Sequence, residues 1–220
     1  MQNQSKSSDP EWTIIKLLEW TTSYFKSHDI DSPRSTAEIL LAHVLKLKRI
    51  DLYLRYDQPL YINELSKFKV LIKRRVEREP VAYIVGVKEF WSMDFAVTKD
   101  VLIPRPETEC LVEKVLELTA GTQSRMRDIL DLGTGCGVIP IMLAFRHPDV
   151  RLIGVEIQRS LSRLARRNVA DNLMTDRVTV LEQDMACLTL DDVNGPVDRV
   201  VANPPYRKLN SGRINADNQR

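Results

Sequence analysis

Apolar positions in the first third of the chain recur every three or four residues, the period of an amphipathic helix. The pattern begins after Asp9-Pro10, an N-capping residue followed by a first-turn proline, and it ends before Pro80. Residues 31–47 and 61–79 repeat it after short breaks. We therefore predict a small helical bundle over residues 1–79. Its apolar positions include Ile14, Leu17, Leu18, Phe25, Ala37, Leu40, Leu41, Val44 and Leu45.

The period changes after Pro80. From there to Pro104 the residues alternate and are often β-branched or aromatic, which is typical of strands joined as a hairpin. Residues 80–109 are predicted to form a β-hairpin linker. Residues 107–119 then return to the helical period.

Residues 110–220 alternate apolar strands with helical stretches. The runs DILDL, VRLIGVEI, VTVLE and VDRVVA have the composition of buried strands, and helices separate the first three. Strands that alternate with helices form a parallel sheet joined by right-handed crossovers. This part of the chain is predicted to be an α/β domain.

Composition changes this picture little. The chain has 220 residues, 43% hydrophobic and 28% charged, and a net charge of +2 that argues neither for nor against nucleic acid. Residues 67–78 and 159–168 are dense in Lys and Arg, and solvated helix faces are the simplest interpretation.

The cysteines are odd in number and lack the spacing of a redox pair or a zinc site; they are Cys110, Cys136 and Cys187. We expect reduced thiols, no metal and a cytoplasmic protein. The first residues contain no apolar leader, and no stretch of about 18 apolar residues exists, so neither a secretory signal nor a membrane span is expected.

Three glycines follow the first strand of the α/β region. Gly133, Gly135 and Gly137 let the chain turn sharply and let a ligand lie against bare backbone. Glu156 ends the next strand, where an acid can accept hydrogen bonds from both hydroxyls of a ribose. Together they predict a nucleotide-binding β-α-β unit.

The residue before the glycines indicates which nucleotide. A dinucleotide fingerprint has the spacing G-x-G-x-x-G, whereas this loop is D-x-G-x-G-x-G, with Asp131 first. A carboxylate there would repel a pyrophosphate and would suit a cation such as an amino-acid ammonium. The pattern favours S-adenosylmethionine over NAD as cofactor.

A third acid, Asp184, follows the third strand of this region. It can accept a hydrogen bond from an adenine amino group, and Met185 can cover the ring. The alternative is an acid exposed in a turn.

The fourth strand ends in Asn203-Pro204-Pro205-Tyr206. Ligands of open α/β sheets bind where the strands end, so this turn is expected to face the methyl donor. The Asn203 side chain and the Pro204 carbonyl can accept both hydrogens of a planar NH₂ group, which orients the nitrogen lone pair toward the sulfonium. Tyr206 offers a stacking surface, and the prolines restrict the turn, as catalysis by orientation requires.

No strong base is required, because an amide or aromatic amine nitrogen loses its proton readily once methylation makes it positive. His28, His43 and His147 are therefore interpreted as surface or packing residues. Cys136 is small enough to fit the loop and is not expected to act as a nucleophile.

Together these motifs resemble the class I, S-adenosylmethionine-dependent amino methyltransferases with an N-P-P-Y turn. Residues 78–109, REPVAYIVGVKEFWSMDFAVTKDVLIPRPETE, are similar to the linker hairpin of the release factor glutamine methyltransferases, the HemK/PrmC family. The helical stretch before them resembles that family's N-terminal domain, which docks the release factor. Over residues 10–206 the resemblance implies a Rossmann-like domain that methylates the glutamine N5 nitrogen in the GGQ loop of peptide chain release factors.

The resemblance also implies roles for single residues. Asn203, Pro204 and Tyr206 are the candidate catalytic residues, and with Pro205 they would bind the substrate glutamine. Phe90, Arg105 and Glu107 border the same pocket in the family. The family often has an aromatic residue where Met185 stands and Asp where Glu156 stands. The cofactor residues would be Gly133, Thr134, Gly135, Cys136, Gly137, Glu156, Asp184, Met185 and Asn203.

From about residue 130 the chain also resembles bacterial tRNA adenine-N6 methyltransferases, through LGTGCGVIPIMLA, GVEIQ, LARRNVADN and NPPYRKLNSGR. Arg207, Lys208 and Arg213 suit phosphate contacts and equally suit a solvated loop. Glutamine and adenine both present a planar NH₂ group, so the turn does not choose between a release factor and a tRNA.

Class I methyltransferases continue beyond this turn with further strands, whereas 17 residues follow Asn203 here. We expect a C-terminally truncated domain with an exposed edge strand, weak binding of the methyl donor and slow turnover. A third possibility is an inactive module whose helical domain binds a release factor.

Overall fold

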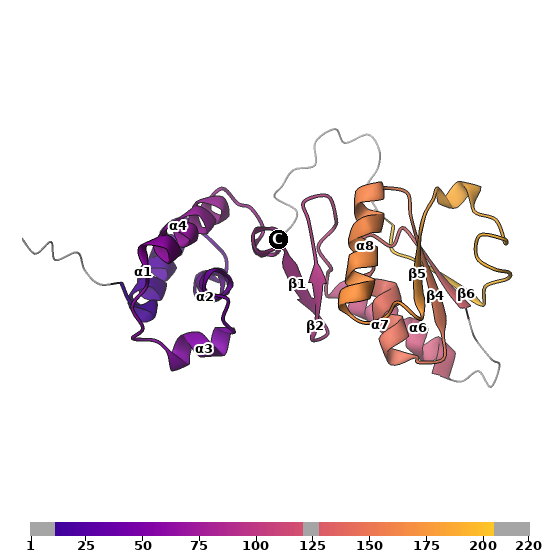
Figure 1. The fold of residues 1–220 in the computed structure, drawn as a ribbon, viewed down its shortest axis with the longest axis horizontal. Helices are drawn as coiled ribbons and strands as arrows, with labels where there is room; N and C mark the ends of the chain where they lie inside the picture. The colour runs from indigo at the N-terminus through magenta and orange to yellow at the C-terminus, as the bar shows by residue number, and fades with distance from the viewer. Residues whose placement is uncertain (1–11, 121–127, 205–220) are drawn as a thin grey trace, which may run out of the picture. The chain divides into compact units, whose positions relative to one another are not determined.

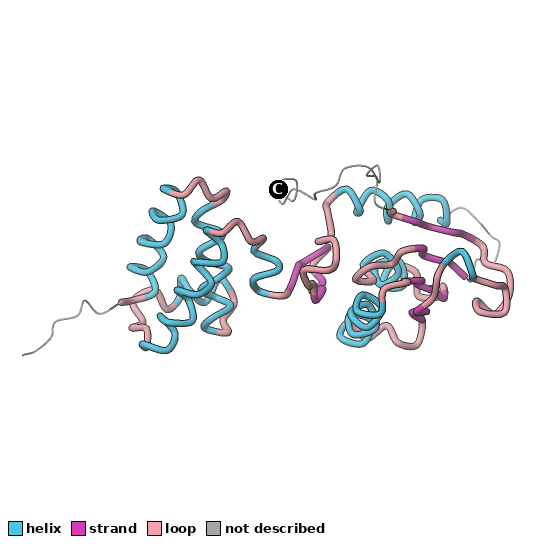
Figure 2. The backbone as a smooth tube through the Cα atoms, turned by 90° about the horizontal axis from the view of Figure 1, so that it is seen from above, coloured by secondary structure: helices cyan, strands magenta, loops and turns pink. Residues whose placement is uncertain are grey.

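The computed structural model describes residues 12–120 and 128–204, which form two compact units, residues 12–85 and 86–204 (Figures 1 and 2). The described part of the first unit is helical, as predicted. Its first helix begins at Ile14 rather than directly after Asp9-Pro10, which lie outside the described residues. The helices are α1 (Ile14–Ser27), α2 (Pro33–Leu45), α3 (Arg49–Leu54), α4 (Ile62–Val76) and α5 (Val81–Val85).

The apolar stripes of these helices meet in one core. Ile14 and Phe25 of α1 are fully buried, and they share the core with Leu40 of α2 and Phe68 of α4. Burying each such side chain contributes about 1.5–3 kcal/mol, which outweighs the weak tendency of a short helix to form alone.

One carboxylate lies within this helical unit. The Glu38 side chain of α2 is 2% exposed and accepts hydrogen bonds from Arg34 Nε and Arg49 Nη2, each at 2.7 Å, and from the Tyr53 hydroxyl. Burial would raise the pKa of Glu38, but these donors outweigh it and hold the pKa below its ordinary value. Because Arg49 and Tyr53 belong to α3, the same network holds α3 against α2.

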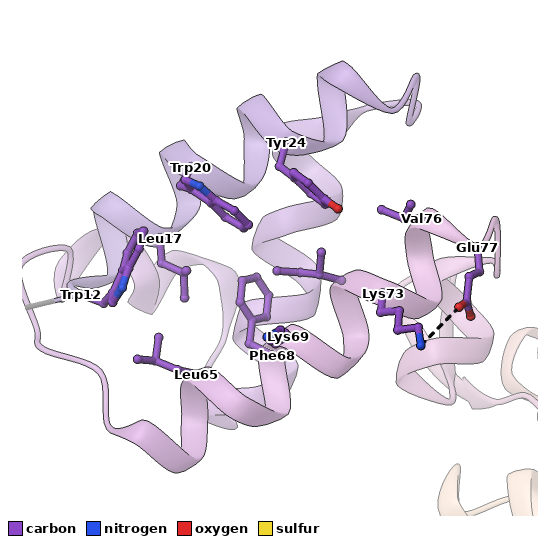
Figure 3. A pocket seen from close by; sticks show the side chains of 11 residues that line it. Trp12, Leu17, Trp20, Tyr24, Leu65, Phe68, Lys69, Lys73, Val76 and Glu77 are labelled. Carbon is purple, nitrogen blue, oxygen red and sulfur yellow. Dashed lines mark ion pairs between the residues drawn. The ribbon is translucent and has the colours of Figure 1, made fainter. Parts of the chain in front are cut away.

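A groove of about 760 Å³ opens between α1 and α4. Figure 3 shows an aromatic wall along this groove. On α1 the Trp20 ring stacks on Tyr24 with centroids 5.1 Å apart, and Trp12, which precedes α1, meets Trp20 edge-on at 6.2 Å. Trp20 is 47% exposed, so this wall is open to solvent. The opposite wall and rim come from α4 and the residue after it, with Leu65, Phe68, Ile72, Lys69, Lys73 and Glu77.

Residues 81–85 correct the sequence-based prediction, because they form the helix α5 rather than a strand. Pro80 supplies the reason, since its carbonyl accepts from the backbone N–H groups of Tyr83 at 3.0 Å and Ile84 at 3.1 Å. Gly86, with φ +76°, then ends the helix, and the strand begins at Val87. The β-branched residues that favour a strand are overridden by this local proline turn.

The second unit contains the predicted hairpin and a parallel sheet. Strands β1 (Val87–Phe90) and β2 (Met93–Ala96) pair antiparallel. The four-stranded sheet has the order β5-β4-β3-β6, and all its pairs are parallel, which confirms the predicted α/β architecture. Its strands are β3 (Asp128–Leu132), β4 (Arg151–Glu156), β5 (Val178–Glu182) and β6 (Arg199–Ala202).

Both faces of this sheet are covered. The helices α7 (Val138–Arg146) and α8 (Arg159–Asp171) pack on β4 and β5, and α6 (Glu107–Ala120) packs on α7. Figure 1 shows α7 and α8 on one side of the sheet and the segment after β5 on the other. Val193 of that segment is buried against Leu130 of β3 and Ile153 of β4. Central strands buried on both faces explain the nearly continuous apolar runs in the sequence.

Within the described ranges, no helix combines the length and the apolar character needed to span a bilayer. In the same part of the chain, no three His, Cys, Asp or Glu side chains gather closely enough to hold a metal ion.

Candidate active site

The predicted site residues follow the carboxyl ends of the parallel strands. The glycine loop follows β3, Glu156 ends β4, Asp184 follows β5 and Asn203 follows β6. Because β4 and β6 pair with opposite edges of β3, the order in which strands are added to the sheet reverses at β3. Open α/β sheets bind their ligands at such a point.

The backbone of the glycine loop is held by the neighbouring strand. The N–H groups of Gly133 and Thr134 both donate to the carbonyl of Val155, at 2.9 and 3.0 Å. Gly137 has φ +81°, and a Cβ there would lie 3.4 Å from the Cβ of Ala165 on α8. A side chain at position 137 would therefore be strained in its backbone and crowded by α8.

Glu156 is 6% exposed and is held by the loop that it faces. One carboxylate oxygen accepts from the N–H of Gly135 and the other from the N–H of Gln158, both at 3.0 Å. Each oxygen retains a further lone pair, so the carboxylate can also accept from a ribose hydroxyl. It links the ends of β3 and β4 across the centre of the site.

The Asp131 side chain, unlike that of Glu156, is buried without backbone donors among the described residues. It is 0% exposed, and neither of its carboxylate oxygens has a hydrogen-bond partner among the described residues. Burial raises the pKa of Asp131 to about 7, and the negative charge of Glu156 adds to the rise. The nearby Thr134 hydroxyl offsets part of it but does not meet the geometry of a hydrogen bond with Asp131. An unpaired buried carboxyl is the kind of group that a bound cation would satisfy.

These residues fit S-adenosylmethionine. A Cβ built on Gly133 would meet nothing within 4 Å, so a ligand can approach the backbone there. Asp131 offers an unsatisfied acid to a cationic group, and Glu156 offers acceptors to a ribose. If the cofactor is bound, Asp131 would hold its cationic methionine part and Glu156 would hold its ribose.

Asp184 and Met185 lie farther out along the sheet. Oδ1 of Asp184 accepts from the N–H of Ala186 at 2.9 Å, which caps the short 3₁₀ helix Met185–Cys187. Its other oxygen is available, and Met185 is 50% exposed. Their role at the adenine stays a prediction.

The amide turn is described as far as Pro204. Asn203 is half-buried, and its Nδ2 donates to Thr108 Oγ1 at 3.5 Å. Pro205 and Tyr206, together with Arg207, Lys208 and Arg213, lie outside the described residues. Their predicted roles in stacking and phosphate binding remain predictions.

Two residues at this site were not identified from the sequence. Thr108, in the first turn of α6, contacts Asn203 although 95 residues separate them. Asn168 of α8 is fully buried, and its Nδ2 donates to the carbonyl of Cys136 in the glycine loop at 2.8 Å. The available signal was an Asn within the apolar stripe of α8, four residues after Leu164. Thr108 had no local signal, because its partner is distant in the chain.

The hairpin residue Phe90 is buried and packs edge-on against Phe95 with ring centroids 6.3 Å apart. Glu107 is exposed at the start of α6, and Arg105 lies two residues before it. Their expected place at the substrate pocket stays a prediction.

Burial raises the pKa of the Cys136 thiol to about 11, so the thiol stays protonated near neutral pH. A protonated thiol is a poor nucleophile.

Comparison with known protein families finds two matches that follow one another along the chain. Residues 16–86 match the family described as PrmC N-terminal domain. Residues 107–217, about half of the chain, match the family described as Methyltransferase small domain.

Curated relatives match across both regions. A protein named release factor glutamine methyltransferase from Chlorobaculum tepidum is 40% identical over 199 residues, which cover 89% of this chain and 68% of the relative. Its namesake from Rhodopirellula baltica is 39% identical over 202 residues, covering 91% of this chain and 68% of the relative. The chain thus spans about two thirds of the length of both. Among solved structures, human methyltransferase 10 domain containing protein matches with 21% identity and a TM-score of 0.47, over 53% of this chain and 56% of that one.

The unpaired Asp131 predicts a pH-dependent stability. Its pKa is about 7 when folded and 3.8 ordinarily, so between these values the folded protein binds more protons and its stability falls as pH rises. Asp131→Asn removes this loss. Without ligand, the variant should be more stable than the wild type by about 1–3 kcal/mol at pH 8, with the difference vanishing near pH 4.

Urea unfolding at several pH values measures this difference. Trp12 and Trp20 lie in the helical unit, so replacing both with Phe leaves Trp91 to report on the second unit. Parallel stability profiles for Asp131→Asn and its parent from pH 4 to 8 would contradict the assignment.

Glu156→Gln tests the acid on β4. The glutamine NH₂ group would face a backbone N–H instead of accepting from it, and the ribose would lose a charged acceptor. Hydrogen bonds to charged groups contribute about 1.5–3 kcal/mol, so we expect the Kd for S-adenosylmethionine to rise about 10- to 100-fold in calorimetric titration. Glu182→Gln is the matched control, because Glu182 is the register partner of Glu156 on β5. Equal affinities for the two variants would show that Glu156 does not bind the cofactor.

Proposed function

The chain belongs to the release factor glutamine methyltransferase family, and we propose that its site methylates the side-chain nitrogen of the glutamine in the GGQ loop of peptide chain release factors. One observation carries this proposal. Leu132 of β3 pairs in register with Ala202 of β6, so the glycine loop and the Asn203 turn leave the sheet side by side. A cofactor held by the loop and an acceptor held by the turn would then be neighbours.

S-adenosylmethionine supplies an electrophilic methyl group on a sulfonium when it is bound. The residues of this chain orient the acceptor. Oδ1 of Asn203 and the carbonyl of Pro204 accept the two hydrogens of the acceptor NH₂ group, which directs its lone pair toward the methyl group. An amide nitrogen becomes acidic as positive charge develops on it, so solvent can take the proton and no side-chain base is needed.

The hydrogen bonds to Asn203 and Pro204 do not distinguish glutamine from adenine, because both acceptors present a planar NH₂ group. The curated relatives favour the glutamine of a release factor, since both carry that substrate in their names. Incubating the protein with labelled methyl donor and either release factor or tRNA tests the choice. Label in the release factor, absent when its GGQ glutamine is replaced by Asn, supports the proposal, and label in tRNA alone refutes it.

The helical unit is proposed to dock the release factor. It matches the PrmC N-terminal domain, and the groove of about 760 Å³ between α1 and α4 is lined mainly by apolar and aromatic side chains. Exposed aromatic side chains of this kind dominate protein interfaces, because they bury much area with few rotatable bonds. Lys69 and Lys73 line the rim of the groove. Their positive charges would suit a segment of the release factor in which acidic residues flank an apolar side chain.

The proposed substrate also suggests where the protein works. Release factors act on ribosomes, so we propose a cytoplasmic location. The exposed thiols of Cys110 and Cys187 are free in the structure, as expected in a reducing compartment.

Asn203→Ala should reduce methyl transfer to a release factor at least 100-fold, which corresponds to about 2.7 kcal/mol of transition-state stabilisation. The Kd for S-adenosylmethionine should stay within about threefold of the wild-type value, since the loop and Glu156 remain. Single-turnover assays and calorimetry measure the two effects. Asn172→Ala, which removes an Asn that contacts Asp94 away from the turn, is the control. Retention of activity within tenfold by Asn203→Ala would disprove the proposed role of the amide.

Trp20→Ala should raise the KM for full-length release factor about tenfold, the equivalent of about 1.4 kcal/mol, while kcat and the Kd for the cofactor stay unchanged. Trp20 is a wall of the groove and has no part in the site at the sheet. Tyr61→Ala removes another exposed aromatic side chain, 72% exposed, from the same unit outside the groove and should leave KM unaltered. Equal KM values for both variants would place docking elsewhere.

A further inference from the structure

The Asn203 side chain has one described partner, and it comes from α6. Nδ2 of Asn203 donates to Oγ1 of Thr108 at 3.5 Å. Thr108 is 6% exposed, so its hydroxyl has little access to solvent. The contact therefore occupies the donor end of the amide on which the proposed acceptor binding depends.

The backbone around Thr108 is itself held in place. The N–H of Thr108 donates to the carbonyl of Arg105 at 3.0 Å, and the N–H of Glu109 donates to the carbonyl of Pro106 at 2.9 Å. Pro104 is buried, and the two prolines restrict the turn that leads into α6. The hydroxyl is thus presented from a constrained turn rather than from a free loop end.

An Asn side chain has two nearly isosteric orientations that differ by a half-turn about its last torsion. In one, the oxygen Oδ1 faces the acceptor; in the other, the NH₂ group does. The acceptor is itself an NH₂ group, so only the first orientation makes a hydrogen bond, and the second opposes donor to donor. Something must distinguish them, because the amide alone does not.

We propose that Thr108 is the positioning residue that makes this distinction, by accepting from Nδ2 so that Oδ1 of Asn203 faces the NH₂ group of the acceptor. The inference rests on the proposed function, since it concerns the acceptor side of the same site. At 3.5 Å the bond is long for N–H···O, as hydrogen bonds at active sites often are before substrate binds and tightens them.

Two substitutions separate this role from packing. Thr108→Val keeps the shape of the side chain and loses the acceptor, whereas Thr108→Ser keeps the acceptor and loses a methyl group. We expect Thr108→Val to lower kcat for methylation of release factor about tenfold, about 1.4 kcal/mol, with little change in KM or in the Kd for S-adenosylmethionine. Thr108→Ser should recover most of kcat. If Thr108 served only packing, Thr108→Ser would be the more damaged variant.

Ser162→Ala is the matched control, because Ser162 of α8 is fully buried and its hydroxyl has no hydrogen-bond partner among the described residues. Removing that hydroxyl should leave kcat unchanged. A decrease in kcat as large as that of Thr108→Val would mean that any buried hydroxyl of this unit has the same effect, and the inference would fail.

A second measurement does not depend on the acceptor. In ¹⁵N-labelled protein, the Asn203 side-chain amide is assigned by its loss in Asn203→Asp, and solvent exchange of its Nδ2 protons is followed by NMR. Exchange should be severalfold faster in Thr108→Val than in the wild type and in Thr108→Ser. Equal exchange in all three proteins overturns the inference. If wild-type protein methylates no release factor, the proposed function fails, while this measurement still decides the role of Thr108.

Discussion

The buried side chain of Asn168 is the contact on which the arrangement of the second unit depends most. Its Oδ1 accepts from the N–H of Ala96, and its Nδ2 donates to the carbonyls of Ala96 and Cys136, all within 3.0 Å. One amide thus satisfies both backbone groups of a residue in β2 and one carbonyl of the glycine loop. Each of these groups would cost about 1–3 kcal/mol if buried without a partner, so α8, the hairpin and the loop are constrained together.

The two acids near the glycine loop differ in whether described protein groups satisfy their carboxylates. Glu156 is compensated, since its oxygens accept from the backbone at Gly135 and Gln158. Asp131 has no hydrogen-bond partner among the described residues, and burial raises its pKa. Thr134 Oγ1, also buried and unpaired, would lie 2.9 Å from a Cβ at Gly154, so the glycine on β4 leaves room for that side chain beside Asp131. Among the buried side-chain atoms without a partner, those of Asp131 and Thr134 lie beside the glycine loop, where a bound cation would satisfy the carboxylate.

Position within the sheet gives the site its two sides. Because β3 is paired with β4 on one edge and β6 on the other, the glycine loop has Glu156 beside it in one direction and Asn203 in the other. The residues that we expect to bind the cofactor lie at the ends of neighbouring strands or in the loops that follow them. The acceptor side also requires α6, which supplies Thr108. The helical unit has its own core and groove, and we propose that this groove binds the release factor.

Hydrophobic periodicity and short motifs were sufficient to predict much of the fold and part of the candidate site. The helical and parallel-sheet regions, the glycine loop and the acid on β4 all follow from patterns within a few residues, because helix period, strand alternation and positive φ are local properties. Within the described residues, 81–85 were wrongly predicted as a strand, because residue preferences do not register the backbone hydrogen bonds to Pro80 that form the helix α5. Three features were decided only by tertiary structure: the unpaired state of Asp131, the triple role of Asn168 and the contact between Thr108 and Asn203. Each depends on which groups meet across tens of residues, and burial then determines whether a polar atom is satisfied by protein, by solvent or only by a ligand.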